Sequence, residues 1–474
     1  MLERLRNHGL ARALLRPALH AGIAGYFRLR RNIGSMPGMR LARALRRGEL
    51  PPLPMEAVMR WRLGPGVGAR AIGRDVVMLV VSDLRIDPRV EREARALADA
   101  GYRVSVLCPD LGQGELAAHD LDWGSGISFE ILPWTAASFV NEQPGFMAHE
   151  LYERAVRRRP FAFHAHDLNT AFAGLAAARR TGAHFIADFH EWTSENVHWD
   201  RDRNAYAPFE GAWKSQLQAL EARCLAEASA VVTVCDSIAE ALAVELGQGR
   251  RPAVVRNIPN VAAGGTRDYP ALKTQLDIPE EQFVLLWQGG TGPTRLIEPL
   301  IEALAFAPRC TLVIRGPSLD QFGEGYRTLA ARIGASERLV LAPPVPSRDV
   351  VAAARGADAG VWTLPSLCRN FTFALPNKIF EYMASGLPVL VAAHPEARRL
   401  VESHGFGLGF DPYDPRSIAA AINRLIDEPD LALACRQATA RALAALDPAL
   451  EWAKLVAIYD GLARAGRLAQ EGNR

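Results

Sequence analysis

Short apolar runs alternate with helical patterns through both halves of this chain, and no other feature limits its possible folds as strongly. The first unit is a buried strand at residues 75–82, a helix at residues 88–100 and a second strand at residues 103–108. Strands that alternate with helices in this way predict parallel sheets covered by helices on both faces. Because such sheets bind ligands at the carboxyl ends of their strands, we expect the functional residues there.

One aperiodic segment divides the alternating pattern. Residues 261–270 are small and rich in glycine, which is typical of a linker, and 474 residues are too many for a single hydrophobic core. We therefore predict two doubly wound, Rossmann-like α/β domains at residues 74–262 and 271–446. A basic helical extension (residues 1–73) precedes them, and a C-terminal helix (residues 447–474) follows.

The remaining elements are predicted from the same patterns. Further strands are expected at residues 127–132, 161–165, 184–189, 230–234, 283–288, 311–315, 339–341, 359–364 and 389–392. Further helices are expected at residues 170–180, 208–228, 296–306 and 415–426. Residues 365–372 are predicted to be a loop and residues 405–409 a turn.

Charge is distributed unevenly along the chain. Residues 1–74 contain 15 Arg, no Lys and three acidic residues, whereas the whole chain has a net charge of only +3. If this Arg-rich segment forms an amphipathic helix, the helix could lie on anionic lipid headgroups. A solvated helical extension packed on the domain, or a disordered segment, would have the same composition. We expect no nucleic-acid partner.

Composition places the chain in a reducing compartment. Its hydrophobic content of 49% and charged content of 23% are those of a soluble globular protein, and neither a convincing signal peptide nor a membrane span is present. The six cysteines are scattered without a C-x-x-C pair, which argues against disulfides and a zinc site. We expect a cytoplasmic protein, either free or peripheral on the inner face of the membrane.

A short helix in the second half combines the residues that an anionic ligand needs. Pro376 suits the first turn of this helix, which leaves the backbone amides of Asn377, Lys378 and Ile379 free to bind an anion. Asn377, Lys378 and Glu381 are spaced to share one helical face. A nucleotide diphosphate could use the cation and the amides, and a ribose diol could donate to the carboxylate. An ordinary ion pair between Lys378 and Glu381 would explain the same spacing.

Two consecutive strands of the first half each end in histidine and carboxylate residues. These are His164, His166 and Asp167 after one strand, and His190 and Glu191 after the next. Three interpretations remain open: a metal site formed by the three histidines, structural histidines that are hydrogen-bonded in loops, and contact with a substrate.

Several of these segments together resemble family-4 glycosyltransferases, which are retaining enzymes with the GT-B fold. The resemblance covers roughly residues 75–465. It rests on the motifs P-N-K-x-F-E-Y from Pro376, D-P-R-V from Asp87, H-x-H-D from His164 and D-x-H-E ending at Glu191, and on the loop Q-G-x-x-x-x-x-R ending at Arg295. It implies that the two domains face a central cleft and that the last helix returns to the first domain.

The resemblance also implies roles for individual residues. In the donor site we expect Gly289, Gly290, Arg295, Arg315, Asn370, Pro376, Asn377, Lys378, Ile379 and Glu381. In the acceptor site we expect Asp87, Arg89, His164, Asp167, His190 and Glu191. The residues expected to take part in catalysis are His166, which would touch the transferred sugar, and Arg295, Lys378 and Glu381.

The chain departs from the family at one position. Relatives carry a glutamate eight residues before Glu381 that contacts the donor sugar, and this chain has Phe373 there. Asn370 is the best substitute in the preceding loop. Asp120-Leu121-Asp122 and Asp200-Arg201-Asp202 spell D-x-D, but neither ends a strand at a plausible nucleotide site, so we predict no metal.

The expected function is transfer of a hexosyl group, with retention, from a nucleotide-diphosphate sugar to a glycan or lipid-linked glycan, as in cell-surface polysaccharide synthesis. The nucleotide sugar would be a co-substrate, and no cofactor is expected. Two alternatives remain: a sugar-nucleotide epimerase or hydrolase of the same shape, and an inactive GT-B scaffold.

Overall fold

The computed structural model describes residues 71–110, 116–132, 149–200, 203–247, 249–259 and 269–471. Almost all of the predicted basic extension (residues 1–73) and most of the predicted linker (residues 261–270) lie outside these ranges. Within the described part of the chain, no helix combines the length and apolar character that a bilayer crossing requires.

The first domain is built on a seven-stranded sheet in which all neighbouring strands run parallel. Its strand order is β3-β2-β1-β4-β5-β8-β9. The strands are β1 (Asp75–Leu79), β2 (Arg103–Pro109), β3 (Ile127–Leu132), β4 (Ala162–His166), β5 (His184–Phe189), β8 (Ala230–Thr233) and β9 (Ala253–Val254). The order reverses between β1 and β4, and this switch point is where doubly wound sheets bind ligands.

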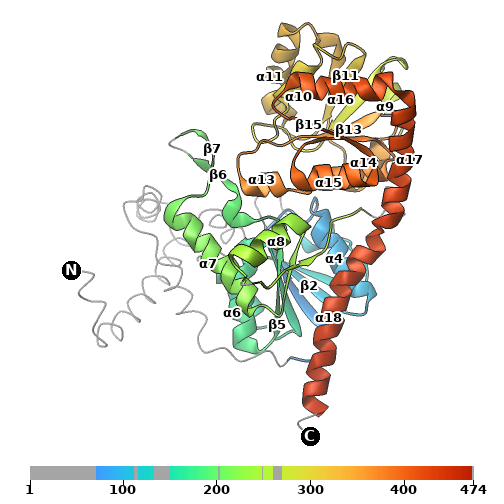
Figure 1. The fold of residues 1–474 in the computed structure, drawn as a ribbon. Helices are drawn as coiled ribbons and strands as arrows, with labels where there is room; N and C mark the ends of the chain where they lie inside the picture. Colours follow the sequence, from blue (N-terminus) through green and yellow to red (C-terminus); the bar gives the residue numbers. More distant parts are fainter. Residues whose placement is uncertain are drawn as a thin grey trace, which may run out of the picture. The chain divides into compact units, whose positions relative to one another are not determined.

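Helices connect these strands (Figure 1). They are α4 (Pro88–Asp99), α5 (His149–Ala155), α6 (Asp167–Thr181), α7 (Gly211–Glu227) and α8 (Asp236–Glu245). The predicted helix at residues 208–228 is shorter than expected because an antiparallel hairpin precedes it, formed by β6 (Val197–Asp200) and β7 (Ala205–Pro208).

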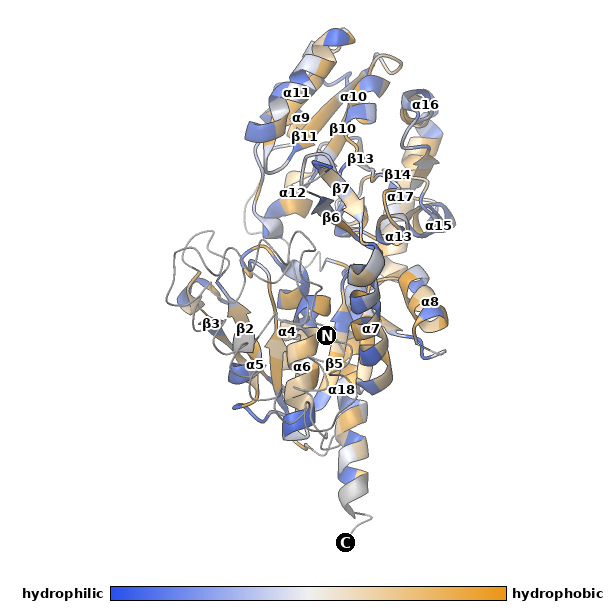
Figure 2. Ribbon diagram, turned by 90° about the vertical axis from the view of Figure 1, so that its left-hand side faces the viewer, coloured by the Kyte–Doolittle hydropathy of each residue, from blue (hydrophilic) through white to orange (hydrophobic). Residues whose placement is uncertain are grey.

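The second domain has a six-stranded parallel sheet with the order β12-β11-β10-β13-β14-β15. Its strands are β10 (Phe283–Gln288), β11 (Cys310–Arg315), β12 (Leu339–Ala342), β13 (Ala359–Trp362), β14 (Val389–Ala392) and β15 (Gly407–Phe410). Its helices are α9 (Leu272–Gln275), α10 (Glu298–Ala303), α11 (Leu319–Arg332), α12 (Val350–Ala353), α13 (Arg369–Phe373), α14 (Asn377–Ala384), α15 (Pro395–His404), α16 (Pro415–Asp427) and α17 (Pro429–Ala445). In Figure 2 the strands of this sheet are mainly hydrophobic and α11 carries many hydrophilic residues.

Two predictions in this domain were wrong. The expected loop at residues 365–372 contains the short helix α13, and the expected turn at residues 405–409 contains the strand β15. Glycine hides this strand from hydrophobic periodicity. It is nevertheless required, since a Cβ on Gly407 would lie 1.8 Å from the carbonyl oxygen of Val389 on the neighbouring strand.

The last helix, α18 (Pro448–Glu471), packs against the first domain. Trp452, Leu455 and Tyr459 recur at helical spacing and join the hydrophobic core that includes the strand residue Val104. The phenol of Tyr102 donates a 2.8 Å hydrogen bond to Asp460. These apolar side chains of the helix therefore form its buried face.

Candidate active site

The helix α14 begins one residue later than the sequence predicted. Pro376 is the residue that caps the helix, in extended conformation (φ −78°, ψ 150°), and Asn377 is the first helical residue. The amide of Ile379 donates to the carbonyl oxygen of Pro376 at 3.2 Å, so it is not free as expected. The amides of Asn377 and Lys378 have no acceptor among the described residues, and they remain available to an anion.

Lys378 lies across the glycine loop that follows β10. A Cβ placed on Gly289 would be 2.1 Å from Cε of Lys378 and 2.6 Å from its Nζ. Gly289 also has a φ of +135°, which side chains other than glycine rarely adopt. The Nζ atom of Lys378 lies 5.9 Å from the centre of the Trp287 ring.

Neither Lys378 nor Glu381 forms a side-chain hydrogen bond or ion pair within the described ranges, so the simple ion pair is not present. Burial lowers the pKa of Lys378 and raises the pKa of Glu381, while each residue favours the charged form of the other. The two groups are therefore close enough to interact but are left without direct partners.

Arg295 is a second cation at this place. The one described hydrogen bond of its side chain goes to the adjacent carbonyl oxygen of Thr294, at 3.4 Å. Burial lowers the pKa of Arg295, and its charge in turn lowers the pKa of Lys378. Gly290 lies beside it, since a Cβ there would be 3.7 Å from Nε of Arg295. Two cations that repel each other, without a carboxylate in ion-pair contact in the described structure, are a favourable place for an anion.

The side chains of three residues predicted in the donor site are engaged by the protein, and one of them is Asn377, whose side-chain oxygen accepts a 2.9 Å hydrogen bond from Asn257. Arg315 is 2% exposed and donates to Gln288, to the carbonyl oxygen of Ala353 and to Gln275. The side-chain oxygen of Asn370 accepts a 2.8 Å hydrogen bond from the amide of Trp192. These contacts give Arg315 a structural role and make Asn370 a link between α13 and the first domain.

Phe373 also takes part in this link. Its ring stacks on Trp192 with the centroids 6.3 Å apart, and the guanidinium of Arg369 lies 4.4 Å from the centre of the Trp192 ring. Arg369 in addition forms an ion pair with Glu245 of α8, at 2.5 Å. Phe373, which stands where the family resemblance implies a glutamate, is therefore part of an aromatic and ionic contact between the domains.

The structure brings together the histidine motifs that end β4 and β5. Nδ1 of His166 lies 3.1 Å from Nε2 of His190. Nε2 of His190 lies 3.1 Å from Oδ2 of Asp188, and Nδ1 lies 3.4 Å from Oδ2 of Asp167. Asp167 also accepts the backbone amide of His190 and has a φ of +60°. Parallel pairing of β4 with β5 places His166 opposite Asp188, which explains why the motifs meet.

Beneath these residues lies a buried network of charged side chains, and only some of its members were predicted from the sequence. Arg89 pairs with Asp188 and with Glu93, both at 2.9 Å, and donates to the carbonyl oxygen of Val255. His164 lies 3.4 Å from Glu93 and receives or donates a 2.8 Å hydrogen bond at Tyr459 of α18. Arg89 and His164, predicted in the acceptor site, are thus buried within the domain. Glu93 could have been found from its spacing of four residues from Arg89.

Burial and charge set the protonation of this network. Burial would raise the pKa of Asp188, but Arg89 and His190 hold it well below its usual value. Burial raises the pKa of Glu93 far above its usual value, although Arg89 opposes this change. Burial lowers the pKa values of His164 and His166. The network therefore contains an ionised Asp188 and neutral His164 and His166.

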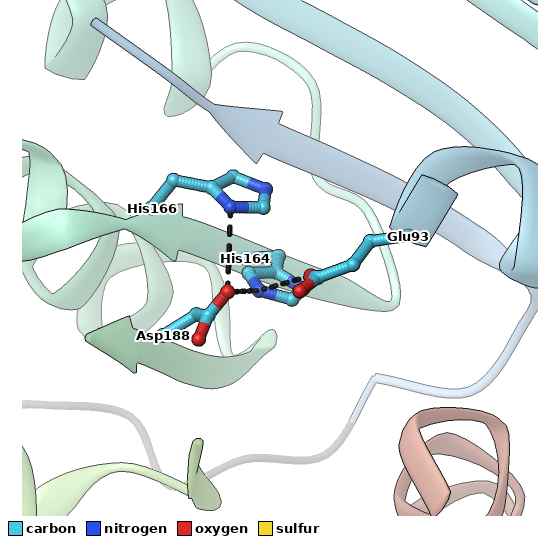
Figure 3. A group of neighbouring side chains, drawn as sticks. All are labelled: Glu93, His164, His166 and Asp188. Atoms are coloured by element: carbon cyan, nitrogen blue, oxygen red, sulfur yellow. Dashed lines mark ion pairs between the residues drawn. The ribbon is translucent and has the colours of Figure 1, made fainter. Parts of the chain in front are cut away.

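Four of these side chains could hold a metal ion (Figure 3). One ligand atom each from Glu93, His164, His166 and Asp188 lies within 4.8 Å of the others. Nitrogen and carboxylate ligands of this kind suit zinc. However, the guanidinium of Arg89 already contacts both carboxylates at 2.9 Å, and its positive charge opposes a second cation.

The remaining predicted acceptor residues lie at the surface side of this network. Asp87 caps α4 by accepting the amide of Val90 at 3.3 Å, and it accepts the hydroxyl of Ser82 at 2.6 Å. Glu191 is exposed and accepts a hydrogen bond from Asn196. Asp87 therefore has the capping role that its position before a helical proline allows.

Two parallel Rossmann-like sheets, with charged residues at the carboxyl ends of their strands, are the architecture of the GT-B class. Sucrose-phosphate synthase from Thermosynechococcus elongatus has the same fold, with a TM-score of 0.67 at 16% identity over 83% of this chain and 100% of that chain. HepE from Anabaena, in complex with UDP and glucose, gives a TM-score of 0.61 at 18% identity over 82% of this chain and 100% of that chain. Identities this low establish a shared fold alone.

Two family profiles match most of the chain. "Glycosyl transferase 4-like domain" matches residues 86–260, and "Glycosyl transferases group 1" matches residues 268–442. The chain therefore belongs to the glycosyltransferases with the GT-B fold, which confirms the expected fold and class of enzyme.

Relatives that are closer in sequence share one description. D-inositol 3-phosphate glycosyltransferase 1 from Catenulispora acidiphila is 27% identical over 323 residues, which are 64% of this chain and 73% of that protein. D-inositol 3-phosphate glycosyltransferase from Thermomonospora curvata is 30% identical over 168 residues, which are 33% of this chain and 38% of that protein. The matches to the latter and to its counterparts from Thermobispora bispora and Streptosporangium roseum span less than half of each relative's length.

Proposed function

We propose that this protein transfers a hexosyl group, with retention of configuration, from a nucleotide-diphosphate sugar to a hydroxyl group of a glycan or lipid-linked glycan. The observation that carries this proposal is the pair of cations at the carboxyl edge of the second sheet. Arg295 and Lys378 interact with each other but with no carboxylate in ion-pair contact in the described structure, and the free amides of Asn377 and Lys378 adjoin them. A diphosphate supplies the missing negative charge.

The same groups account for catalysis. As the glycosidic bond breaks, negative charge grows on the departing diphosphate, and fixed cations and amides stabilise that charge where it develops. Gly289 and Gly290 allow the backbone to approach the phosphates, and Glu381 accepts the hydroxyl hydrogens of the ribose. Ordering of the ribose positions the reacting carbon for attack. In the first domain, His166 contacts the transferred sugar, and Asp167, His190 and Glu191 line the approach of the acceptor.

The neighbours support this choice of donor. HepE structures are described in complex with UDP and with UDP-glucose, so UDP-sugars are the first donors to test. The curated relatives are named for D-inositol 3-phosphate, which makes an inositol phosphate a second acceptor to test beside glycans and lipid-linked glycans. We also propose a cytoplasmic location, peripheral to the membrane, for which the Arg-rich residues 1–74 are the support.

Thermal unfolding with a panel of UDP-, GDP- and TDP-sugars tests the proposal. A ligand at about 100 times its Kd stabilises the folded state by about 2.7 kcal/mol, so the true donor should raise Tm measurably. The stabilising donor is then incubated with candidate acceptors. Hydrolysis or epimerisation of the donor without any acceptor would favour an epimerase or hydrolase, and binding without turnover would favour an inactive scaffold.

A further inference from the structure

The contact between His166 and His190 decides which nitrogen of His166 carries a proton. The imidazole of His190 lies between two carboxylates: Asp167 is 3.4 Å from its Nδ1, and Asp188 is 3.1 Å from its Nε2. A carboxylate at each ring nitrogen favours the imidazolium form, in which both nitrogens are donors. Nδ1 of His166 lies 3.1 Å from the same Nε2 atom. The one proton on Nε2 of His190 is shared between Oδ2 of Asp188 and Nδ1 of His166, both at 3.1 Å, whereas Oδ2 of Asp188 is 3.5 Å from Nδ1 of His166. A proton on Nδ1 of His166 would face this shared proton, so Nδ1 is the acceptor.

This constraint places the proton of neutral His166 on Nε2. That atom is buried and has no hydrogen-bond partner among the described residues. Figure 3 shows it on the side of the ring that faces away from Asp188. Buried N–H groups in folded proteins are almost always paired, so an unpaired one that faces away from its own network indicates a missing acceptor. An oxygen atom of a bound substrate is such an acceptor.

The surrounding charges favour this arrangement at neutral pH. The groups that face His190 are Asp167 of α6, Asp188 of β5, Arg89 and Glu93 of α4, His164 and His166 of β4, and the adjacent Glu191. Burial opposes a charged His190, but Asp167 and Asp188 outweigh it and raise the pKa of His190 to about 10. Burial also raises the pKa of Asp167, while His190 opposes that increase. Arg89 opposes the charge on His190 only in part, because it is itself paired with Asp188 and Glu93.

We propose that His190 is a positioning residue whose imidazolium, held between Asp167 and Asp188, fixes His166 as the Nε2–H tautomer, so that His166 donates a hydrogen bond to an oxygen of the transferred sugar. The assignment of this oxygen atom to the transferred sugar rests on the proposed function. The tautomer itself is a property of the protein without ligand, so it can be measured independently of transfer. His166 then favours donor sugars that carry a hydrogen-bond acceptor atom at the position that its Nε2–H reaches.

The experiment reads the tautomer of His166 directly. The full chain is labelled with ¹⁵N-histidine, and long-range ¹H–¹⁵N correlation spectra are recorded without ligand at pH 7.5. His166→Gln identifies the signals of His166. In the wild type we expect the Nε2–H pattern. In His190→Phe the one acceptor left near Nδ1 among the described residues is Asp188, 3.5 Å away, so we expect the proton to move to Nδ1.

Two further variants separate positioning from structural damage. His190→Gln retains an N–H donor near the position of Nε2, so it should retain the Nε2–H pattern. His184→Gln replaces another buried histidine at the opposite end of β5, and it should leave the His166 signals unchanged. In transfer assays, Asp167→Asn should move the alkaline limb of the kcat profile to a pH below the value of about 10 expected for His190.

Three outcomes would overturn the proposal. The first is an Nδ1–H pattern in the wild type, and the second is an unchanged His166 pattern in His190→Phe. The third is a stoichiometric metal ion in the purified protein that persists in His190→Phe, since a metal on Nδ1 would fix the tautomer without His190. If no donor supports transfer but the tautomer changes as expected, the proposed function fails and the positioning role of His190 stands.

Discussion

The side chain of Lys378 crosses Gly289 so closely that a Cβ on the glycine would lie 2.1 Å from Cε of the lysine. The two residues are 89 positions apart, and the parallel strands β10, β13 and β14 bring their elements to one edge of the sheet. The ammonium group is thereby held beside the glycine loop and the start of α14. The contact explains why this loop needs glycine and how the lysine is directed without a hydrogen bond in the described structure.

Gly289→Ala should therefore weaken donor binding by about 10-fold or more, because every 1.4 kcal/mol of lost binding energy is tenfold. The new methyl group displaces Lys378 and adds strain at a φ of +135°. Isothermal titration with the donor measures the change. Gly325→Ala is the matched control, since a Cβ there has nothing within 4 Å and should leave the affinity unchanged. Equal affinities for the two variants would contradict the proposed contact.

Arg295→Ala should lower kcat by about 10²–10³-fold while leaving the fold intact, because it removes a cation that stabilises the departing diphosphate. The single described hydrogen bond of its side chain goes to a neighbouring carbonyl, so little stability is lost. Steady-state transfer assays and Tm measure the two effects. Arg327→Ala, an exposed arginine of α11, is the control. A kcat unchanged by Arg295→Ala would remove Arg295 from the mechanism.

Arg89→Met should destabilise the protein by about 3–5 kcal/mol, because it removes the guanidinium that pairs with the buried carboxylates of Asp188 and Glu93. Chemical denaturation measures the loss. Arg85→Met removes an exposed arginine that pairs with Asp83, and its free energy of unfolding should stay close to that of the wild type. A similar small cost for both variants would show that the buried network does not depend on Arg89.

Glu221→Gln should stabilise the protein at pH 8 and have little effect near pH 4. Glu221 is buried, and burial raises its pKa to about 7 from a usual value of 4.5. The folded state therefore holds a proton that the unfolded state releases, and the stability that this proton provides decreases as pH rises from 4.5 through 7. The glutamine keeps an oxygen to accept the amide of Ser194. We expect a gain of about 1–3 kcal/mol at pH 8 in denaturant unfolding.

The control for this prediction is Glu210→Gln, an exposed residue just before α7, which should show no such dependence on pH. The prediction fails if the stability difference between Glu221→Gln and the wild type is the same at pH 4 and pH 8.

Sequence patterns predicted the sheets well because both are buried on two faces. Strands such as β5 and β10 read as continuous apolar runs, and their predicted bounds agree with the structure. The strand β15 was missed because of its two glycines. They add no side-chain volume, they interrupt the alternating apolar pattern, and they have low β propensity. The hairpin of β6 and β7 was not predicted, since each of its strands has only four residues.

The site was predictable where residues act through local motifs and unpredictable where they act across the fold. Lys378 and Gly289 were each found from their own segments. The roles of Arg315 and Asn370 were not, because their partners Ala353 and Trp192 lie far away in the sequence. Asp188 opens the D-x-H-E motif and Glu93 lies four residues after Arg89 on the same helix, but only tertiary packing brings these two carboxylates to the histidines of β4.

Titration of UDP into the wild type and into Lys378→Ala by calorimetry tests the central claim most directly. The control is Lys454→Ala, which removes a lysine on α18 that pairs with Glu451. We predict that Lys378→Ala weakens UDP binding by about 10–100-fold, because a charged hydrogen bond to phosphate is lost, and that Lys454→Ala binds as the wild type does. UDP that binds the wild type and Lys378→Ala with equal affinity would contradict the account.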